Sequence, residues 1–189
     1  MRGSAQRYPL VAAGNIPGRS FAPMPRIGLI SDTHGWLDPR VQEHFALCDE
    51  VWHAGDLGPG VAEELAGWKP LKAVHGNIDD GRVRQAYPEH LRFAAEGVRV
   101  WMTHIGGRPP RYTPPVLAAL RSTPTDLFIC GHSHICAAQF DPAVNCLYLN
   151  PGAAGRHGWH QVRTLLRFGL EAGKVHGLEV IELGKRGAV

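Results

Sequence analysis

The chain has 189 residues, of which 44% are hydrophobic and 20% are charged, values that fit one globular domain with a sizeable core. No apolar run approaches the roughly 18 residues of a membrane span, so no spanning helix is predicted. The formal net charge is +3. The first 25 residues hold three arginines and no acidic residue, so the rest of the chain has 17 basic and 17 acidic residues. This neutral body is not the broad basic surface that long nucleic acid requires.

Residues 1–24 are predicted to be an N-terminal extension, and residues 25–189 a single domain. Three prolines and three glycines interrupt any periodicity in the extension, and its apolar run at 11–13 is too short for the core of a signal peptide. Arginine without acid is a weak sign of an organelle transit peptide, but the prolines oppose an amphipathic helix. We expect a mobile tail, or a start site placed upstream of Met24.

The periodicity predicts βαβ alternation early in the chain and a strand-rich second half. The predicted strands are 26–31, 50–54, 71–75, 90–96, 98–103, 126–130, 135–140, 145–149, 162–168 and 174–183, and the predicted helices are 39–47, 61–67 and 115–122. This pattern indicates a mixed α/β fold.

Five short polar motifs each follow one of the predicted strands. They are Asp32-Thr33-His34, Gly55-Asp56, Gly76-Asn77, His104 and Gly131-His132-Ser133-His134. Ligand sites in α/β sheets gather at the carboxyl ends of strands, because the loops of neighbouring strands converge there. Together the motifs supply two carboxylates, one amide oxygen and four imidazoles, a set suited to two adjacent divalent metal ions.

Each of these residues also has a simpler interpretation. Asp32 alone fits a turn cap, Asn77 a left-handed turn residue and His104 a core histidine. The combination nevertheless favours metal binding, because the donor types match known ligand chemistry. Nitrogen and oxygen donors without thiolate suit Mn²⁺, Fe, Zn²⁺, Ni²⁺ or Co²⁺ rather than Ca²⁺, and Mn²⁺ is our choice among them.

The order of the motifs, D-x-H, G-D, G-N, H and G-H-x-H, resembles that of the calcineurin-like metallophosphoesterase superfamily. The match runs over residues 27–152, and finer details, including Asn150-Pro151-Gly152, resemble the YfcE-like small phosphodiesterase branch, which also contains a subunit of the eukaryotic retromer. The resemblance implies a four-layer α-β-β-α sandwich of two mixed β-sheets flanked by helices.

The resemblance also implies a role for each motif. Asp56 would bridge two ions, the first held further by Asp32, His34 and His134 and the second by Asn77, His104 and His132. The implied activity is a metal-dependent phosphodiesterase that hydrolyses a small phosphodiester through a dinuclear centre and a metal-activated hydroxide, with Asp56, Asn77 and His104 as catalytic residues.

One position departs from the pattern of many superfamily members. Many members carry a histidine directly after the metal-binding asparagine, whereas this chain has Ile78. The YfcE-like branch also commonly lacks that histidine. Isoleucine cannot protonate a leaving group, and removal of a general acid typically costs about 10²–10⁴ in rate. A modest enzyme that prefers acidic leaving groups is therefore expected.

Several further residues are weaker candidates for substrate contact. Asp79 is a candidate proton donor or a turn cap; Arg108 and Arg111 are candidates to hold a phosphate oxygen, or solvated arginines in a rigid loop; and Tyr112 is a candidate to stack on a base. His53 and His75 are interpreted as supporting or core residues beside ligands. His44, His90, His157, His160 and His176 fit no motif.

The alternative function is a non-catalytic binding scaffold on the same fold, like the retromer subunit. Scaffolds tend to replace ligand histidines, and this chain keeps all seven ligand positions, which favours the enzyme. A repair-type nuclease is a minor alternative, and the expected substrate is a small phosphodiester, with a cyclic nucleotide as one candidate.

Four cysteines without a CxxC pair or secretory signal indicate free thiols in the cytoplasm. Homo-oligomers are common among such small domains, but the sequence specifies no interface.

Overall fold

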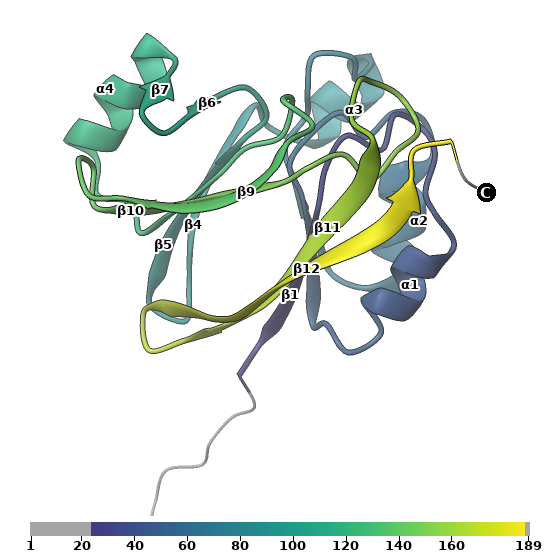
Figure 1. Ribbon diagram of the computed structural model, residues 1–189, viewed down its shortest axis with the longest axis horizontal. Coiled ribbons are helices and arrows are strands. Elements are labelled where there is room, and N and C mark those ends of the chain that lie inside the picture. Colours follow the sequence, from purple (N-terminus) through teal and green to yellow (C-terminus); the bar gives the residue numbers. More distant parts are fainter. Residues whose placement is uncertain (1–23, 188–189) are drawn as a thin grey trace, which may run out of the picture.

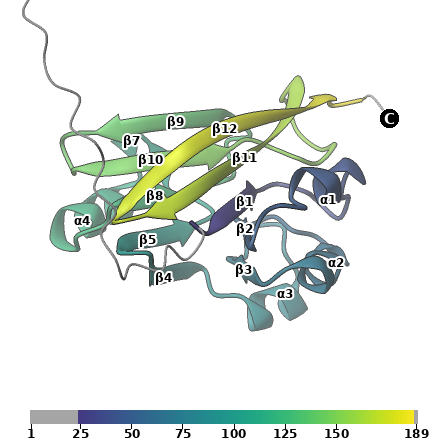
Figure 2. The same cartoon turned by 90° about the horizontal axis from the view of Figure 1, so that it is seen from below.

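Two five-stranded β-sheets lie face to face in the structure, a computed structural model that describes residues 24–187. Helices cover the outer faces, with α4 on one side of the sandwich and α1 and α2 on the other (Figures 1 and 2). This arrangement is the predicted four-layer α-β-β-α sandwich, so the fold prediction is confirmed. The predicted extension, apart from Met24, lies outside the described residues.

The first sheet has the strand order β12-β11-β1-β2-β3. Its strands are β1 Arg26–Ile30, β2 Glu50–His53, β3 Leu71–Ala73, β11 Val162–Glu171 and β12 Lys174–Lys185, and the helices between its first strands and after the third are α1 Arg40–His44, α2 Val61–Trp68 and α3 Gly81–Ala86. β1, β2 and β3 are parallel, whereas β11 runs antiparallel to β1 and β12 antiparallel to β11. The three parallel strands therefore present their carboxyl ends at one edge.

The second sheet has the order β4-β5-β8-β10-β9. Its strands are β4 His90–Ala95, β5 Val98–Thr103, β8 Leu127–Ile129, β9 Cys136–Asp141 and β10 Cys146–Pro151; a small hairpin of β6 Gly107–Arg108 and β7 Arg111–Tyr112, followed by helix α4 Pro114–Ser122, connects β5 to β8. β5, β8 and β10 are parallel, and the outer strands are antiparallel to them.

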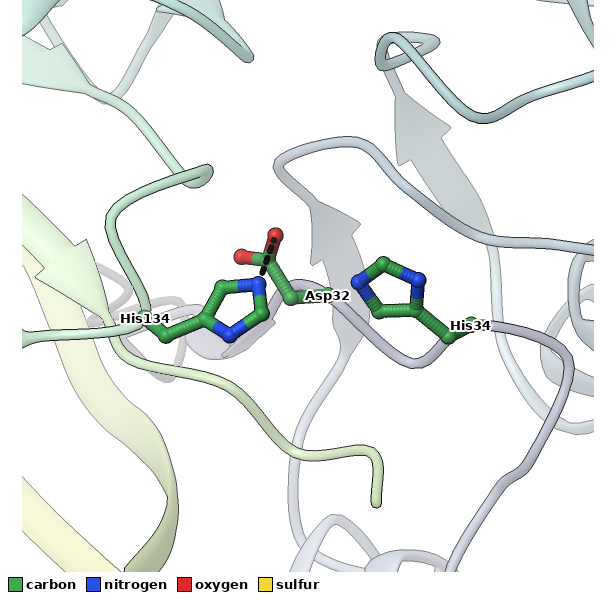
Figure 3. A group of neighbouring side chains, drawn as sticks. All are labelled: Asp32, His34 and His134. Carbon is green, nitrogen blue, oxygen red and sulfur yellow. Dashed lines mark ion pairs between the residues drawn. The ribbon is translucent and has the colours of Figure 1, made fainter. Parts of the chain in front are cut away.

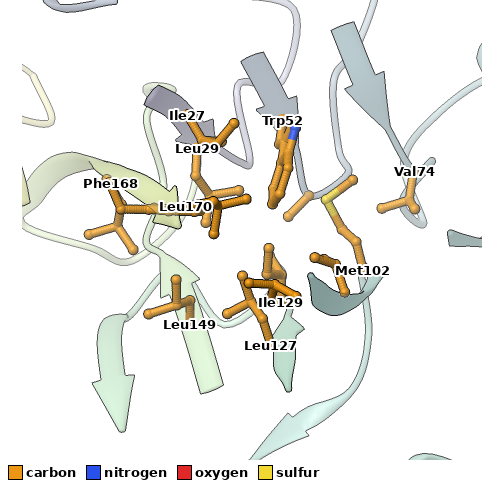
Figure 4. Close-up of a cluster of buried hydrophobic side chains, with 14 residues drawn as sticks. Ile27, Leu29, Trp52, Val74, Met102, Leu127, Ile129, Leu149, Phe168 and Leu170 are labelled. Carbon is orange, nitrogen blue, oxygen red and sulfur yellow. The ribbon is translucent and has the colours of Figure 1, made fainter. Parts of the chain in front are cut away.

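Alternation along the strands builds the core between the sheets. Ile27 and Leu29 of β1 point into the central cluster, together with Trp52 and residues of the second sheet (Figure 4). The intervening Gly28 faces Phe45, and a Cβ at this glycine would lie 2.6 Å from the ring. The helix on this side can therefore approach the strand closely because position 28 has no side chain.

Three local features differ from the sequence prediction. The pattern missed α3, which has only six residues and begins at a glycine, but the Asp80 carboxylate caps it by accepting from the N–H groups of Arg82 and Val83. It also missed the β6–β7 hairpin, and the helix predicted over 39–47 ends at His44. Between residues 24 and 187, no helix is long and apolar enough to cross a membrane.

Candidate metal centre

The polar motifs meet where the carboxyl ends of the parallel strands of both sheets converge. Asp32 follows β1, Asp56 follows β2, His104 follows β5 directly, and His132 follows β8. Asp32, Asp56 and His104 are buried. Seven predicted ligands from loops far apart in sequence thus lie at the ends of five strands, as the sequence pattern indicated.

Asp32, His34 and His134 form one group of converging donor atoms (Figure 3). His134 Nε2 lies 3.1 Å from Asp32 Oδ1. The rings of His34 and His134 meet edge to face, with centroids 5.5 Å apart. These are the residues predicted for the first ion.

Asp32, Asp56 and His104 form a second group, which is fully buried. His104 Nε2 lies 3.2 Å from Asp56 Oδ2 and 4.0 Å from Asp32 Oδ1. The same Asp56 Oδ2 lies 3.7 Å from His34 Nε2. One carboxylate oxygen therefore stands between a histidine of the first predicted set and a histidine of the second, which is the geometry that a bridging ligand needs.

Each aspartate uses one oxygen for structure and presents the other to the centre. Asp32 Oδ2 accepts hydrogen bonds from Ser31 Oγ at 2.6 Å and from the His132 N–H at 3.1 Å. Asp56 Oδ1 accepts from the Ile78 N–H at 3.1 Å. The carboxylates are therefore oriented by the protein itself, as ligating groups commonly are.

Three of the converging atoms are buried without a hydrogen-bond partner among the described residues: Asp32 Oδ1, His34 Nε2 and His104 Nε2. His104 Nδ1 must be the protonated nitrogen of a neutral ring, because it lies 2.8 Å from the Ala54 carbonyl oxygen, which only accepts. Its Nε2 lone pair then faces carboxylate lone pairs. Such an arrangement is unfavourable unless a cation or a proton lies between them, so these residues fit divalent metal ions.

The protonation tendencies of His34, His132 and Asp56 also suit metal binding, whereas that of His104 opposes it. Burial lowers the pKa of His34 and of His132, which favours the neutral imidazoles that bind metals. Burial raises the pKa of Asp56, but His104 and the Ile78 N–H outweigh it, and the net pKa is lowered. Burial likewise lowers the pKa of His104, but Asp56 and Asp32 outweigh it and raise the net pKa, so a proton competes with a cation at this nitrogen.

The ligand loops adopt an unusual backbone conformation. Five of the predicted ligands have positive φ angles, namely Asp32 (54°), His34 (50°), Asp56 (56°), His132 (65°) and His134 (58°), and only three other non-glycine residues of the described chain do. Left-handed backbone costs a side-chain-bearing residue about 1–2 kcal/mol. Strained residues of this kind cluster at functional sites, where surrounding structure holds them. Gly76 allows this crowding, because a Cβ there would lie 2.0 Å from Asp56 Oδ1.

The remaining predicted residues take varied positions. Asn77 is exposed and lines a pocket of ≈160 Å³ with His104. Arg108 and Arg111 are exposed and line a different pocket, of ≈310 Å³, that reaches His132. Each of the two pockets is lined by at least one predicted metal ligand, so both adjoin the predicted centre.

Asp79 and Tyr112 do not occupy substrate-facing positions. The buried Asp79 carboxylate accepts from three backbone N–H groups, those of Leu57, Gly58 and Gly76, and so joins two ligand loops. This is a positioning role, and the predicted substrate contact has no geometric support. Tyr112 is buried against Phe128 and Tyr148 beneath α4, so the prediction that it stacks on a base disagrees with its position.

His53 holds the loop of Asp32 and His34 through hydrogen bonds, in agreement with its interpretation as a supporting residue. Its Nδ1 accepts from the Gly55 N–H at 3.2 Å, so Nε2 carries the proton and donates to Thr33 Oγ1 at 3.0 Å. Burial lowers the pKa of His53 to about 4. A neutral imidazole therefore anchors the turn between two predicted ligands.

Two histidines that matched no motif flank the first group. The ring of His157 stacks on that of His34, with centroids 5.5 Å apart and planes 21° apart. The ring of His160 packs edge to face on that of His134 at 5.3 Å. The only signal in the sequence was the proximity of His157 to the Asn150-Pro151-Gly152 turn, because the contacts depend on how residues 155–160 fold back over the centre.

The fold agrees with the comparisons to known proteins. The model of the calcineurin-like phosphoesterase superfamily domain matches residues 25–173, and the chain belongs to this family. The family and the candidate ligand groups together define a metal-binding phosphoesterase of the hydrolase class. A comparison with curated protein sequences finds no match.

Solved structures share the fold at low sequence identity. A single mutant of Vps29 from Entamoeba histolytica is 17% identical, with a TM-score of 0.66, and the alignment covers 84% of this chain and 99% of that one. An archaeal phosphodiesterase is 21% identical with the same TM-score and the same coverage. A Thermotoga maritima protein is 24% identical with a TM-score of 0.64, again over 84% and 99% of the two chains. These likenesses show the fold alone.

Proposed function

We propose that the protein is a metal-dependent phosphodiesterase that hydrolyses a small phosphodiester at a dinuclear centre. The observation that carries the proposal is the convergence of three buried, unpartnered donor atoms from Asp32, His34 and His104 around Asp56 Oδ2. In this proposal Asp56 would be shared by two ions. The first ion would be held further by Asp32, His34 and His134, the second by Asn77, His104 and His132, and Mn²⁺ is proposed ahead of Fe, Zn²⁺, Ni²⁺ and Co²⁺.

Divalent ions at such a site neutralise phosphate oxygens and lower the pKa of a bound water. The chain itself supplies orientation. Hydrogen bonds from Ser31, His132 and Ile78 fix the two carboxylates, while the exposed Asn77 and His132 leave the second half open to an arriving phosphate. Arg108 and Arg111 are proposed to bind a phosphate oxygen from the neighbouring pocket.

Neither of the two residues that follow Asn77 is placed to protonate a leaving group. Ile78 is exposed at the rim, and the Asp79 carboxylate is occupied by backbone N–H groups. Esters whose leaving groups are acidic need little protonation, so they are the proposed preferred substrates. A cyclic nucleotide is a further candidate, and its sugar leaving group would need a proton from another residue or from solvent.

A binding scaffold remains the alternative, since Vps29 and a phosphodiesterase share this fold. The complete ligand set favours the enzyme, but metal binding alone does not separate the two functions, because a Vps29 from Entamoeba histolytica is described as a Zn²⁺ complex. Turnover is therefore the deciding measurement. All four cysteines are free in the structure, and the cytoplasm, which keeps thiols reduced, is the proposed location.

The direct test is hydrolysis of bis(p-nitrophenyl) phosphate after removal of metal with a chelator, with and without added Mn²⁺. We expect turnover only with the ion. Asp56→Asn should reduce it by at least about 10³-fold, because an amide is a poor bridging ligand, while circular dichroism stays unchanged. Glu171→Gln is the matched control. This exposed carboxylate lies at the end of β11 that pairs with the amino end of β1, which is the end opposite the predicted ligands. Absence of turnover with Mn²⁺, Fe²⁺, Zn²⁺, Ni²⁺ and Co²⁺ would favour the scaffold.

A further inference from the structure

Trp159 is the most exposed of the large hydrophobic side chains in the described chain, with a relative exposure of 101%. An indole buries more apolar surface than almost any other side chain when it finds a partner, and tryptophan is enriched at binding hot spots. Leaving it wholly in water forgoes that free energy in the unbound protein. Its position relative to the metal centre therefore needs an explanation.

The backbone that carries Trp159 is fixed to the candidate metal centre. Gly158, with φ 111°, lies so close to the ring of His134 that a Cβ would come within 2.1 Å of Nδ1. The Gly158 carbonyl accepts a hydrogen bond from Arg186 Nη1 at 2.7 Å, and His160 lies 3.1 Å through Nε2 from the carbonyl oxygen of Gly155. The loop is thus held on both sides of the tryptophan, and only the indole is free.

A pocket of ≈320 Å³ connects Trp159 with the predicted ligands. It is lined by His132, Ser133, His134, Ile135, Trp159 and His160. Its lining combines a histidine from each half of the predicted centre with the indole and the half-exposed Ile135. A phosphoryl group bound at those histidines would therefore have apolar and aromatic side chains within the same pocket to receive one of its ester arms.

We infer that Trp159 is the stacking platform for a planar aromatic group on one ester arm of the substrate, as in a nucleotide diester. The inference rests on the proposed function, which places the phosphoryl group at the predicted metal ligands. A flat ring matches the wall better than a sugar or an alkyl chain, because the indole offers a π-face and no hydrogen-bond acceptor. Trp159 is in this view a specificity-determining residue.

The first measurement is binding to the Mn²⁺-loaded protein, by calorimetry, of AMP and of ribose 5-phosphate, which lacks the base. Stacking of a base on an aromatic side chain is worth about a tenfold change in affinity or more. We expect AMP to bind about tenfold more tightly than ribose 5-phosphate. Trp159→Ala should remove that advantage, and Trp159→Phe should keep most of it. Because the side chain makes no core contact, neither substitution should unfold the protein.

Phe140→Ala is the matched control. Phe140 is also an exposed aromatic residue, but it pairs with Leu147 at the end of the second sheet remote from the ligands. This variant should bind both compounds as the wild type does. In turnover of bis(p-nitrophenyl) phosphate, Trp159→Ala should raise KM about tenfold and leave kcat nearly unchanged, because the platform binds the aromatic arm rather than the reacting atoms.

The outcomes separate this inference from the proposed function. Equal binding of AMP and ribose 5-phosphate, or an equal loss of both in Trp159→Ala, would overturn the platform even if turnover is normal. A Trp159-dependent preference for AMP in a protein without turnover would support the platform and overturn the hydrolase. Failure of both compounds to bind would overturn the platform.

Discussion

The two halves of the predicted metal centre differ in how well the protein encloses them. In the first half, His34 and His134 are half-buried, and each imidazole packs against a further histidine, His157 or His160. In the second half, Asn77 and His132 are exposed, and only His104 is buried. The enclosed half is therefore preorganised, and the open half is the one that solvent reaches.

The difference arises from one loop. Residues 155–160 follow β10 and fold over the first half, whereas the loops beside the second half leave two pockets open. A ligand whose ring is already held loses less conformational entropy when an ion binds. We therefore expect the first half to hold its ion more tightly than the second.

The largest expected effect is on metal content, in two variants that each lack one ligand of one half. His134→Ala should abolish tight binding at the first half, and His132→Ala should leave one ion bound. Metal content after gel filtration, measured by mass spectrometry of the elements, distinguishes the two variants. If both variants retain the same amount of metal, the asymmetry is absent.

The hydrogen bonds of His53 to the first ligand loop should make the free energy of unfolding depend on pH. The pKa of His53 is lowered from 6.5 to about 4, so between these values the unfolded state binds a proton that the folded state does not. Stability should therefore fall as pH decreases from about 6.5 to about 4, by up to about 3 kcal/mol from this residue. Urea titrations of metal-free protein should show a shallower decline for His53→Gln. An unchanged slope would contradict the assignment.

The ring of His157 should affect the metal affinity of the first half only. His157→Ala removes the ring that stacks on His34, so metal affinity should fall, by less than the about 10–100-fold that follows loss of a hydrogen-bonded supporting partner. Competition with a fluorescent chelator measures this change. His176→Ala is the control, because His176 is exposed on β12 opposite Gly169, away from the centre. A similar loss in both variants would mean that the effect is general.

The smallest expected effect comes from the open half. Ile78 is exposed, and its N–H holds Asp56, so Ile78→His adds an imidazole at the rim without changing that hydrogen bond. Activity should rise by up to about 10-fold for esters with poorer leaving groups and change little for p-nitrophenyl esters. A flat response across leaving groups would show that another group already supplies the proton.

Much of this fold could be predicted from the sequence because its signals are local. The apolar alternation of β1, with Ile27 and Leu29 facing one side, predicts a strand, and the motif after it lies where strand ends gather ligands. The order of the motifs, through the family resemblance, indicated the two-sheet sandwich. The loops around the centre were less predictable, since Asp79 contacts two of them through backbone groups that have no residue signature.

Residues outside the motifs show where sequence reasoning stops. Tyr112 follows two arginines in a Pro/Gly loop, so the sequence predicts a surface residue. The β6–β7 hairpin instead turns its ring into the core beneath α4. His157 and His160 read as unassigned histidines because their contacts with His34 and His134 are tertiary. Trp159 has no periodic pattern, and only the three-dimensional path of its loop brings it to the pocket.

The left-handed backbone at five predicted ligands sets stability against metal binding at the predicted centre. Glycine adopts positive φ without the steric cost that Asp or His carries, so replacing an exposed ligand such as His132 with glycine should relieve strain while it removes a donor. Selection for thermal stability alone would therefore drift towards ligand loss at these loops. An evolved variant that melts at a higher temperature should be screened for metal content before its stability is counted as a gain.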